Sequence, residues 1–277
     1  MSLKEQPATV ATSTGFSGRS AWQPLGALVG IYVRSANDST PRPVPSARAV
    51  AEFGLADDRH ASFQSPRQLL LASVAAYREW ALPPMSLREN LLVDLSVGRL
   101  DPGDLLRVGD DMVLWLTFPC EPCGLLERRC PGTVKTIGEN RGMLARVVRG
   151  GVMHQDDAIA ARQANAPALS ADWQDRVRHV AQAVPEGLFI SHRQLGQMAG
   201  VPTAYCRAFP RVLSRLPASV VSRVRSEASM KGVPRWSGAG LFDISEPVTS
   251  QGSDRFDHQA RCLRPCAPGP GDDASDQ

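Results

Sequence analysis

The chain has 277 residues, which is room for one large domain or two small ones. Hydrophobic residues make up 43% of it, so a packed core is expected and wholesale disorder is excluded. The formal net charge of +3 is too small to indicate a nucleic-acid-binding protein by itself. Three of the 31 basic residues are lysines (Lys4, Lys135 and Lys231) and the rest are arginines. Two explanations fit this excess of arginine over lysine. One is a mutational bias toward arginine codons, and the other is phosphate binding, which suits the planar guanidinium group.

The sequence contains no apolar run of about 18 residues, so we expect no transmembrane helix and no membrane partner. Residues 1–20 lack the apolar segment of a signal peptide, and we therefore predict a cytoplasmic protein. In a reducing compartment, clustered cysteines indicate metal ligands or reactive thiols more than a disulfide framework.

In chain order, the first half predicts a mixture of strands and loops. We expect a flexible arm (1–21), a strand (25–34), a Pro-rich loop (35–48), a helix after Pro66 (67–81), a hairpin of two strands (105–108 and 113–118), a long loop (119–140) and a short helix or strand (143–151). The hairpin prediction depends on the Gly-Asp-Asp turn between its strands.

The second half predicts a small helical domain (172–246) after a linker (163–171). Asp172 is a natural N-cap for a helix that ends at Pro185. Further helices are expected from 191 to 200 and from 203 to 216, a helix-turn-helix arrangement. Residues 170–246 hold ten basic and six acidic residues, a local charge of +4. The polar, Pro- and Gly-rich tail (247–277) is predicted to be disordered.

A cysteine loop and several arginines carry the chemistry of the first half. The loop contains Cys120 and Cys123 and follows a predicted strand. Cations nearby lower the pKa of a cysteine, and its thiolate is both a nucleophile and a soft-metal ligand. Two alternatives stay open: the cysteines pack at a strand end, or they bind zinc together with Cys130 and His154.

Short motifs in a fixed order surround that loop: GLADDRH (54–60), RQ (67–68), RENL (88–91), GDLLRVG (103–109), FPCEPC (118–123), RG (141–142) and GG (150–151). Together they resemble the MOSC domain, the C-terminal domain of molybdenum cofactor sulfurases, which also occurs alone. The resemblance covers residues 22–162. It departs at Ala56 and Asp57, where the family favours Glu and Gly, so we expect this loop to differ in shape.

The resemblance implies an α+β chain whose β-rich, barrel-like domain holds a basic pocket for the pterin phosphate of the molybdenum cofactor. It implies Cys123 as the catalytic residue and metal ligand, with Cys120 as the second candidate. The implied cofactor contacts are Arg59, His60, Arg67, Arg88, Asn90 and Arg141. Each of these residues also has a non-functional interpretation. The arginines could form surface ion pairs, and His60 could make a structural hydrogen bond.

The predicted function is therefore binding of molybdopterin cofactor, or sulfur carriage, in redox or sulfur-transfer chemistry. A redox or sulfur-donor protein is the expected protein partner. Sulfurases also use pyridoxal phosphate, in a separate domain. Lys135 is the only lysine within residues 22–162, so we expect no Schiff base there.

Residues 172–246 resemble the DNA-binding domain of alkylguanine-DNA alkyltransferases and of their inactive relatives, the alkyltransferase-like proteins. The matching strings are VPEG (184–187), ISHRQL (190–195), AGVP (199–202), CRA (206–208) and SRV (222–224). Where the family has its acceptor cysteine and activating histidine, this chain has Val221 and Ser222. We therefore predict a winged-helix-like domain without alkyl transfer.

This resemblance implies DNA contacts from His192 and from Arg207, which would fill the stack when a base is flipped. Arg211 and Arg215 continue at a spacing of four and predict a basic helical face for phosphates. Pro210 is expected to kink that helix. The alternative function is thus non-enzymatic DNA binding or lesion recognition. The competing interpretation is a winged-helix scaffold that has lost DNA binding, in which these arginines lie on a solvent-exposed helical face.

Overall fold

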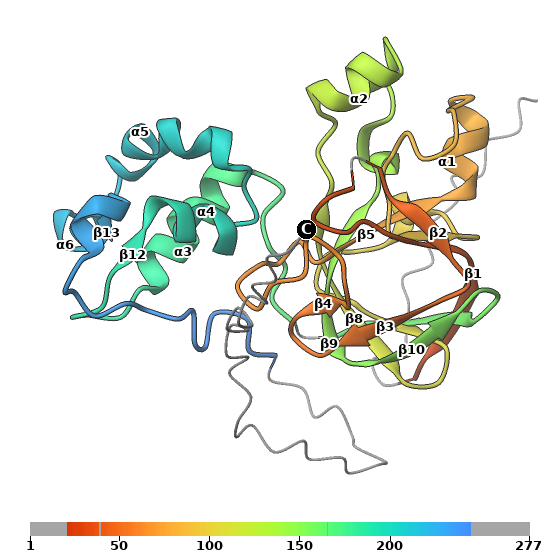
Figure 1. Ribbon diagram of the computed structural model, residues 1–277, viewed down its shortest axis with the longest axis horizontal. Helices are drawn as coiled ribbons and strands as arrows, with labels where there is room; N and C mark the ends of the chain where they lie inside the picture. Colours follow the sequence, from red (N-terminus) through yellow and green to blue (C-terminus); the bar gives the residue numbers. More distant parts are fainter. Residues whose placement is uncertain (1–20, 39, 165, 245–277) are drawn as a thin grey trace, which may run out of the picture. The chain divides into compact units, whose positions relative to one another are not determined.

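The structure is a computed structural model that describes residues 21–38, 40–164 and 166–244 (Figure 1). The predicted disordered tail, and the predicted arm apart from Ala21, lie outside these residues. All described residues fall within one compact unit, Met1–Glu246. None of the helices in this part of the chain is long and apolar enough to cross a membrane.

Seven strands close into a β-barrel (Figure 1). Their order around the barrel is β1-β11-β7-β8-β9-β5-β6, and β6 pairs again with β1. Within this barrel the β5–β6 pair is parallel, and the other pairs are antiparallel. The strands are β1 (Gln23–Val33), β5 (Leu69–Ser73), β6 (Leu91–Val93), β7 (Leu105–Val108), β8 (Met112–Pro119), β9 (Met143–Arg149) and β11 (Ala158–Arg162).

Shorter elements decorate the barrel. Strand β2 (Arg42–Val44) extends the sheet beyond β1, and β3 (Ser46–Val50), β4 (Gly54–Leu55) and β10 (Gly151–His154) form a separate small sheet. The helices are α1 (Val74–Glu79) and α2 (Gly124–Arg129). The 3-10 turns are η1 (Val97–Arg99), η2 (Thr133–Lys135) and η3 (Gly138–Arg141).

Strand β8 shows how the barrel is buried on two faces. Met112, Leu114 and Leu116 belong to the main core, whereas Val113 and Trp115 face a second apolar cluster. This cluster also includes Phe242, whose ring lies 6.2 Å from the Trp115 ring. Because side chains alternate along a strand, apolar residues at every position mean that both faces are covered.

The helical part has an apolar cluster of its own, built around residues such as Val177, Leu195 and Phe209. Asp172 caps α3 and Ser191 caps α4, because their side-chain oxygens accept hydrogen bonds from backbone N–H groups. The cap at Asp172 was predicted from the sequence. The elements are α3 (Trp173–Ala183), β12 (Ile190–Ser191), α4 (His192–Met198), η4 (Thr203–Ala208), α5 (Phe209–Leu213), α6 (Ala218–Val221), β13 (Val224–Arg225) and η5 (Glu227–Met230).

Several sequence-based predictions need correction. The helix predicted at 67–81 begins with a strand: every residue of β5 is buried, and α1 begins only at Val74. A short buried apolar run cannot be assigned to helix or strand by periodicity alone. The Pro-rich loop contains β2 and most of β3, and the long cysteine loop contains α2. Residues 143–149 are the strand β9.

Pro210 does not kink a recognition helix. The chain is a 3-10 segment up to Ala208, and Pro210 stands in the first turn of α5. Proline is tolerated there because the first N–H groups of a helix have no partner inside it.

The loop around Asp57 keeps a conformation that suits the glycine preferred by the MOSC pattern. Asp57 has φ +63°, in the left-handed region. Aspartate is among the residues that enter this region at low cost. The departure from the MOSC pattern at this position therefore does not require a different backbone.

Gly200 lies at a close contact between the helical part and the barrel. Its φ is +63°, and a Cβ atom would lie 2.8 Å from Phe118 Cζ and 3.0 Å from Arg67 Cγ. Its carbonyl accepts a hydrogen bond of 3.0 Å from Arg67 Nη1. The chain thus needs glycine here for both conformation and packing.

We predict that Gly200→Ala lowers the free energy of unfolding by about 3 kcal/mol, from left-handed strain plus overpacking. Gly232→Ala is the matched control, because Gly232 has φ +76° but no atom within 4 Å of its Cβ position. It should cost only about 1 kcal/mol. Urea denaturation of both variants measures the difference, and equal losses would show that the Gly200 contact is not tight.

Asp104 should make stability depend on pH. Burial and the nearby Asp101 carboxylate raise the pKa of Asp104 to about 6, although the Ala164 N–H opposes this. An acid with a raised pKa contributes stability at low pH that is lost as pH rises through about 6. Since Asp104 is half-buried, we expect Asp104→Asn to gain only about 1 kcal/mol over the native chain above that pH.

Thermal melts at about pH 4.5 and about pH 7.5, on either side of the raised pKa, check this prediction. Asp110→Asn, which changes an exposed carboxylate on the neighbouring turn, is the control. A gain from Asp104→Asn that is the same at both pH values would contradict the assignment.

Candidate functional site

Cys123 lies at the start of α2, and its side chain is exposed. Partial burial disfavours its thiolate. The backbone N–H groups of Leu126 and Leu125 and the Arg141 guanidinium favour the thiolate, and together they lower the pKa of Cys123 below its ordinary value. A thiolate at this position is both a nucleophile and a soft ligand.

Arg141 is the most informative cation near Cys123. Arg141 is the last residue of η3 and is only 6% exposed. Its Nε and Nη1 atoms nevertheless have no hydrogen-bond partner in the structure. A buried donor without a partner costs about 1–3 kcal/mol, and more when it is charged. An anion bound at Arg141 would remove that cost. Arg141 thus has two donors available beside the thiol.

Arg88 adds to the positive charge at Cys123, and Arg129 lies near Arg88. Burial lowers the pKa of Arg88, the charges of Arg129 and Arg141 lower it further, and the Cys123 thiolate opposes them. Arg88 also has φ +58°, a left-handed conformation that is unusual for a long side chain. The sequence predicted Arg88 and Arg141 but missed Arg129, which follows the cysteine motif on α2.

A buried carboxyl group lies behind these arginines. Glu89 is 1% exposed and accepts a hydrogen bond of 2.7 Å from the Tyr77 hydroxyl. Burial raises the pKa of Glu89, although Tyr77 and Arg141 oppose this. The RENL motif was noted, but Tyr77 was not expected to take part.

A second group of predicted residues gathers at Asp58. Its carboxylate accepts hydrogen bonds from Arg34 N (3.0 Å), His60 N (2.8 Å) and Asn90 Nδ2 (2.9 Å). The His60 ring contacts the Arg34 guanidinium, and Arg59 is exposed beside it. Arg59 and His60 thus lie together, at a buried carboxylate and not at the thiol.

Asn90 and Arg67 are already bound to other groups. The Asn90 amide donates to Tyr32 O and Asp58 Oδ2 and accepts from Leu70 N, so it fixes the end of the RENL loop. Arg67 donates to Gly200 O of the helical part. Their contact with a cofactor stays a prediction.

Cys120 differs from Cys123 in its surroundings. It is 4% exposed and packs with Leu70, Phe118 and Leu144, as the strand-end alternative expected. Cys130 is also buried, in another apolar cluster. Among the described residues, no three His, Cys, Asp or Glu side chains converge as a metal site requires. The zinc alternative with Cys130 and His154 is therefore not formed.

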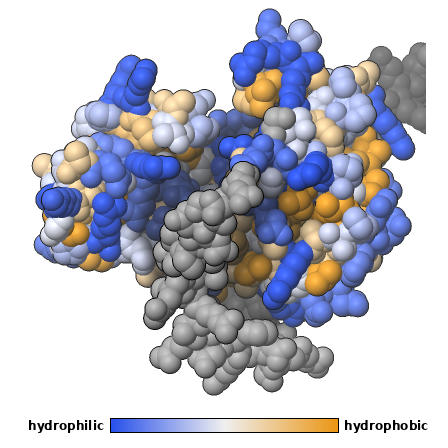
Figure 2. Space-filling model, in the orientation of Figure 1, coloured by the Kyte–Doolittle hydropathy of each residue, from blue (hydrophilic) through white to orange (hydrophobic). Residues whose placement is uncertain are grey.

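The residues predicted to bind DNA do not form one helical face. Arg207 lies on η4, Arg211 on α5, and Arg215 beyond the end of α5; all three are exposed. His192 is the first residue of α4 and is half-buried, 6.4 Å from the Phe209 ring. Hydrophilic side chains are common on the visible face of this part (Figure 2). DNA binding stays a prediction.

Comparison with known proteins finds one family model that matches part of the chain. A model of the MOSC domain matches residues 58–160, which include β5 to β9, Cys123 and Arg141. The α+β prediction with a barrel-like domain is confirmed by the closed seven-stranded barrel. The match ends before the helical part, whose likeness to alkyltransferases stays a prediction. No curated protein matches the chain.

Several solved structures resemble the fold weakly. The YUAD protein from Bacillus subtilis is 16% identical over 51% of this chain and 98% of its own, with a TM-score of 0.46. YiiM from Geobacillus stearothermophilus is 16% identical over 70% and 100%, with a TM-score of 0.40. YiiM from Escherichia coli is 19% identical over 71% and 94%, with a TM-score of 0.39.

We predict that Arg141→Gln raises the pKa of Cys123 and slows its alkylation near pH 7 by about three- to tenfold, because a cation that favours the thiolate is lost. Iodoacetamide labelling followed by peptide mass spectrometry measures Cys123 separately from the other cysteines. Arg128→Gln, which changes an exposed arginine on α2, should leave the alkylation rate of Cys123 unchanged. Equal slowing in both variants would contradict a specific role for Arg141.

Proposed function

We propose that this protein binds molybdenum cofactor, or carries sulfur, through Cys123. The observation that carries the proposal is the buried Arg141 guanidinium, with two unpartnered nitrogen atoms beside a thiol whose pKa is lowered. The MOSC match over this segment supports it, because the family is associated with that cofactor.

The residues present fit the cofactor. A thiolate is a soft ligand that suits molybdenum, and the Cys123 side chain is exposed and available. Arginine guanidiniums bind phosphate through charged N–H donors, and Arg141 offers two without a partner, at Nε and Nη1. When bound, the cofactor would supply redox chemistry. Cys123 would hold the metal, while Arg141 and Arg88 would hold anionic groups.

Sulfur carriage uses the same thiolate. Cys123 would attack the terminal sulfur of a donor persulfide, RSSH, to form a Cys123 persulfide and release the RS⁻ thiolate. The arginines favour this step because they keep Cys123 ionised and stabilise the negative charge of the product. A persulfide-bearing donor protein, or a redox protein for the molybdenum alternative, is the proposed partner.

Cys123→Ser should lower the stoichiometric loading of molybdenum, or of cyanide-labile sulfur, by at least about tenfold, because a hydroxyl is a poor soft-metal ligand. Elemental analysis, pterin fluorescence and cyanolysis of the purified full chain measure the two forms of loading separately. Cys120→Ser should reduce loading much less, since Cys120 is enclosed in an apolar cluster.

Equal loading of the native chain and Cys123→Ser would refute the proposal. Equal loss in both cysteine variants would instead indicate that the two thiols share one site.

A further inference from the structure

A cavity of about 350 Å³ lies beside α3, away from the residues described around Cys123. Four segments line it: residues 167–170 before α3, α3 itself, the end of α4, and the segment that follows η5. The apolar lining side chains are Leu169, Val180, Met198, Leu241 and Phe242. A concave space of this size with a mostly apolar lining is typical of small-molecule sites.

The walls of the cavity are held by packing on their outer sides. Val180 and Met198 are 3% and 1% exposed and belong to the core of the helical part. On the opposite wall, the Phe242 ring lies 6.2 Å from the Trp115 ring of β8 and 4.6 Å from the Arg146 guanidinium. Apolar groups around an open space lack the contacts that close packing supplies, and an apolar occupant restores them.

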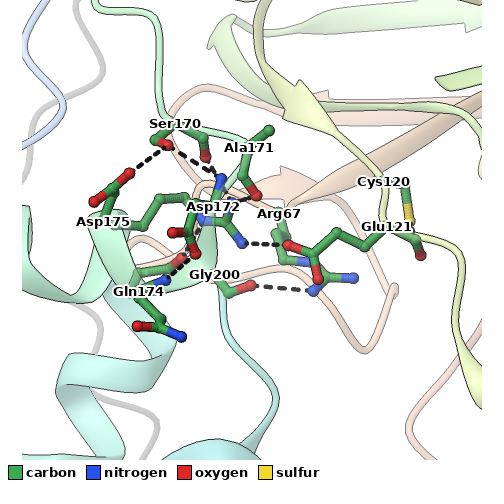
Figure 3. Close-up of polar contacts among 11 residues, drawn as sticks. Arg67, Cys120, Glu121, Ser170, Ala171, Asp172, Gln174, Asp175 and Gly200 are labelled. Carbon is green, nitrogen blue, oxygen red and sulfur yellow. Dashed lines mark hydrogen bonds and ion pairs between the residues drawn. The ribbon is translucent and has the colours of Figure 1, made fainter. Parts of the chain in front are cut away.

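The positive charge at the cavity is already bound. Arg176 lines it and is 4% exposed. Its Nε donates to Ala199 O (2.9 Å), and its Nη1 donates to Ser170 O (2.6 Å) and Ala171 O (2.8 Å) (Figure 3). Its Nη2 donates to Glu121 Oε1 at 3.4 Å. Because every nitrogen atom of this guanidinium has an acceptor, the cavity has no free cationic donor for an anionic ligand.

The negative charge at the cavity is bound as well. The Asp175 carboxylate forms an ion pair with Arg178 and accepts a hydrogen bond of 3.3 Å from Ser170 Oγ (Figure 3). His179 is the remaining lining side chain with polar atoms, and its exposed ring makes no hydrogen bond within the described part of the chain. The lining therefore offers an apolar body with neutralised charges and one imidazole for a polar atom.

We propose that this cavity binds a small neutral aromatic molecule of two rings that carries one hydrogen-bonding group. An apolar cavity of about 150 Å³ holds benzene, so about 350 Å³ is room for two fused rings. The rings lie between α3 and Phe242, and the polar atom bonds to the His179 imidazole. This site gives the helical part a binding function of its own, which depends neither on Cys123 nor on a cofactor.

The probe is 5-fluoroindole, which has two fused rings, no charge and one N–H group. A fluorine NMR titration with the full chain should give a Kd below about 1 mM, as expected for a ligand of this size in an apolar site. Indoleacetate and tryptamine, the anionic and cationic analogues, should displace the probe at least about tenfold less well, because a charge would lose its water without gaining a partner. Equal displacement by either analogue would contradict the neutral ligand.

Val180→Phe tests the position of the site, because the larger side chain fills the space that the ligand needs. We expect at least about tenfold weaker binding of 5-fluoroindole. Ala183→Phe adds a ring to an exposed position of the same helix, outside the lining, and should leave the Kd unchanged. Circular dichroism confirms that each variant is folded.

His179→Phe decides the question if Val180→Phe fails to fold. It keeps a ring at this exposed position and removes the hydrogen-bonding nitrogen atoms, so 5-fluoroindole should bind about three- to tenfold less tightly. N-methylindole lacks the N–H group and should bind the native chain and His179→Phe alike. The absence of probe binding to the native chain, or an equal Kd for the native chain and folded Val180→Phe, would overturn the proposal. So would an unchanged Kd in His179→Phe.

Discussion

The barrel closes through one strand, and the positions of the other strands depend on it. The first half of β1 pairs with β11 and its second half pairs with β6. The register shifts between Pro24 and Gly26, and again between Leu28 and Gly30. A Cβ atom on Gly26 would lie 2.3 Å from Asp94 O, so only glycine permits this approach. Closure leaves no open edge between β6 and β11, and it holds the ends of β5, β8 and β9 near one another.

The ends of those strands carry the site. Strand β8 leads into the cysteine loop, β9 begins directly after Arg141 and Gly142, and the RENL motif leads into β6. Thiol and guanidinium therefore meet because two adjacent antiparallel strands end and begin at the same rim. Two arginines of that rim, Arg88 and Arg141, place positive charge near Cys123.

The sequence predicted the features that depend on local pattern. The β7–β8 hairpin was recognised because a Gly-Asp-Asp turn joins two apolar runs, and the cap of α3 because Asp172 precedes a helical pattern. Strand β5 was mistaken for a helix because it is buried on both faces and lacks alternation. The choice between Cys120 and Cys123 had no local signal. It depends on which thiol lies at a helix start and which lies in an apolar cluster.

The three-carbonyl seat of Arg176 has a thermodynamic consequence. The Arg176 guanidinium donates to the carbonyl oxygens of Ala199, Ser170 and Ala171, so losing it would leave three acceptors without that donor. The Phe118 ring lies under the Arg176 guanidinium, 3.8 Å from its centroid, and also against the Gly200 position. A substitution at either residue of the helical part would therefore disturb the same aromatic ring of β8.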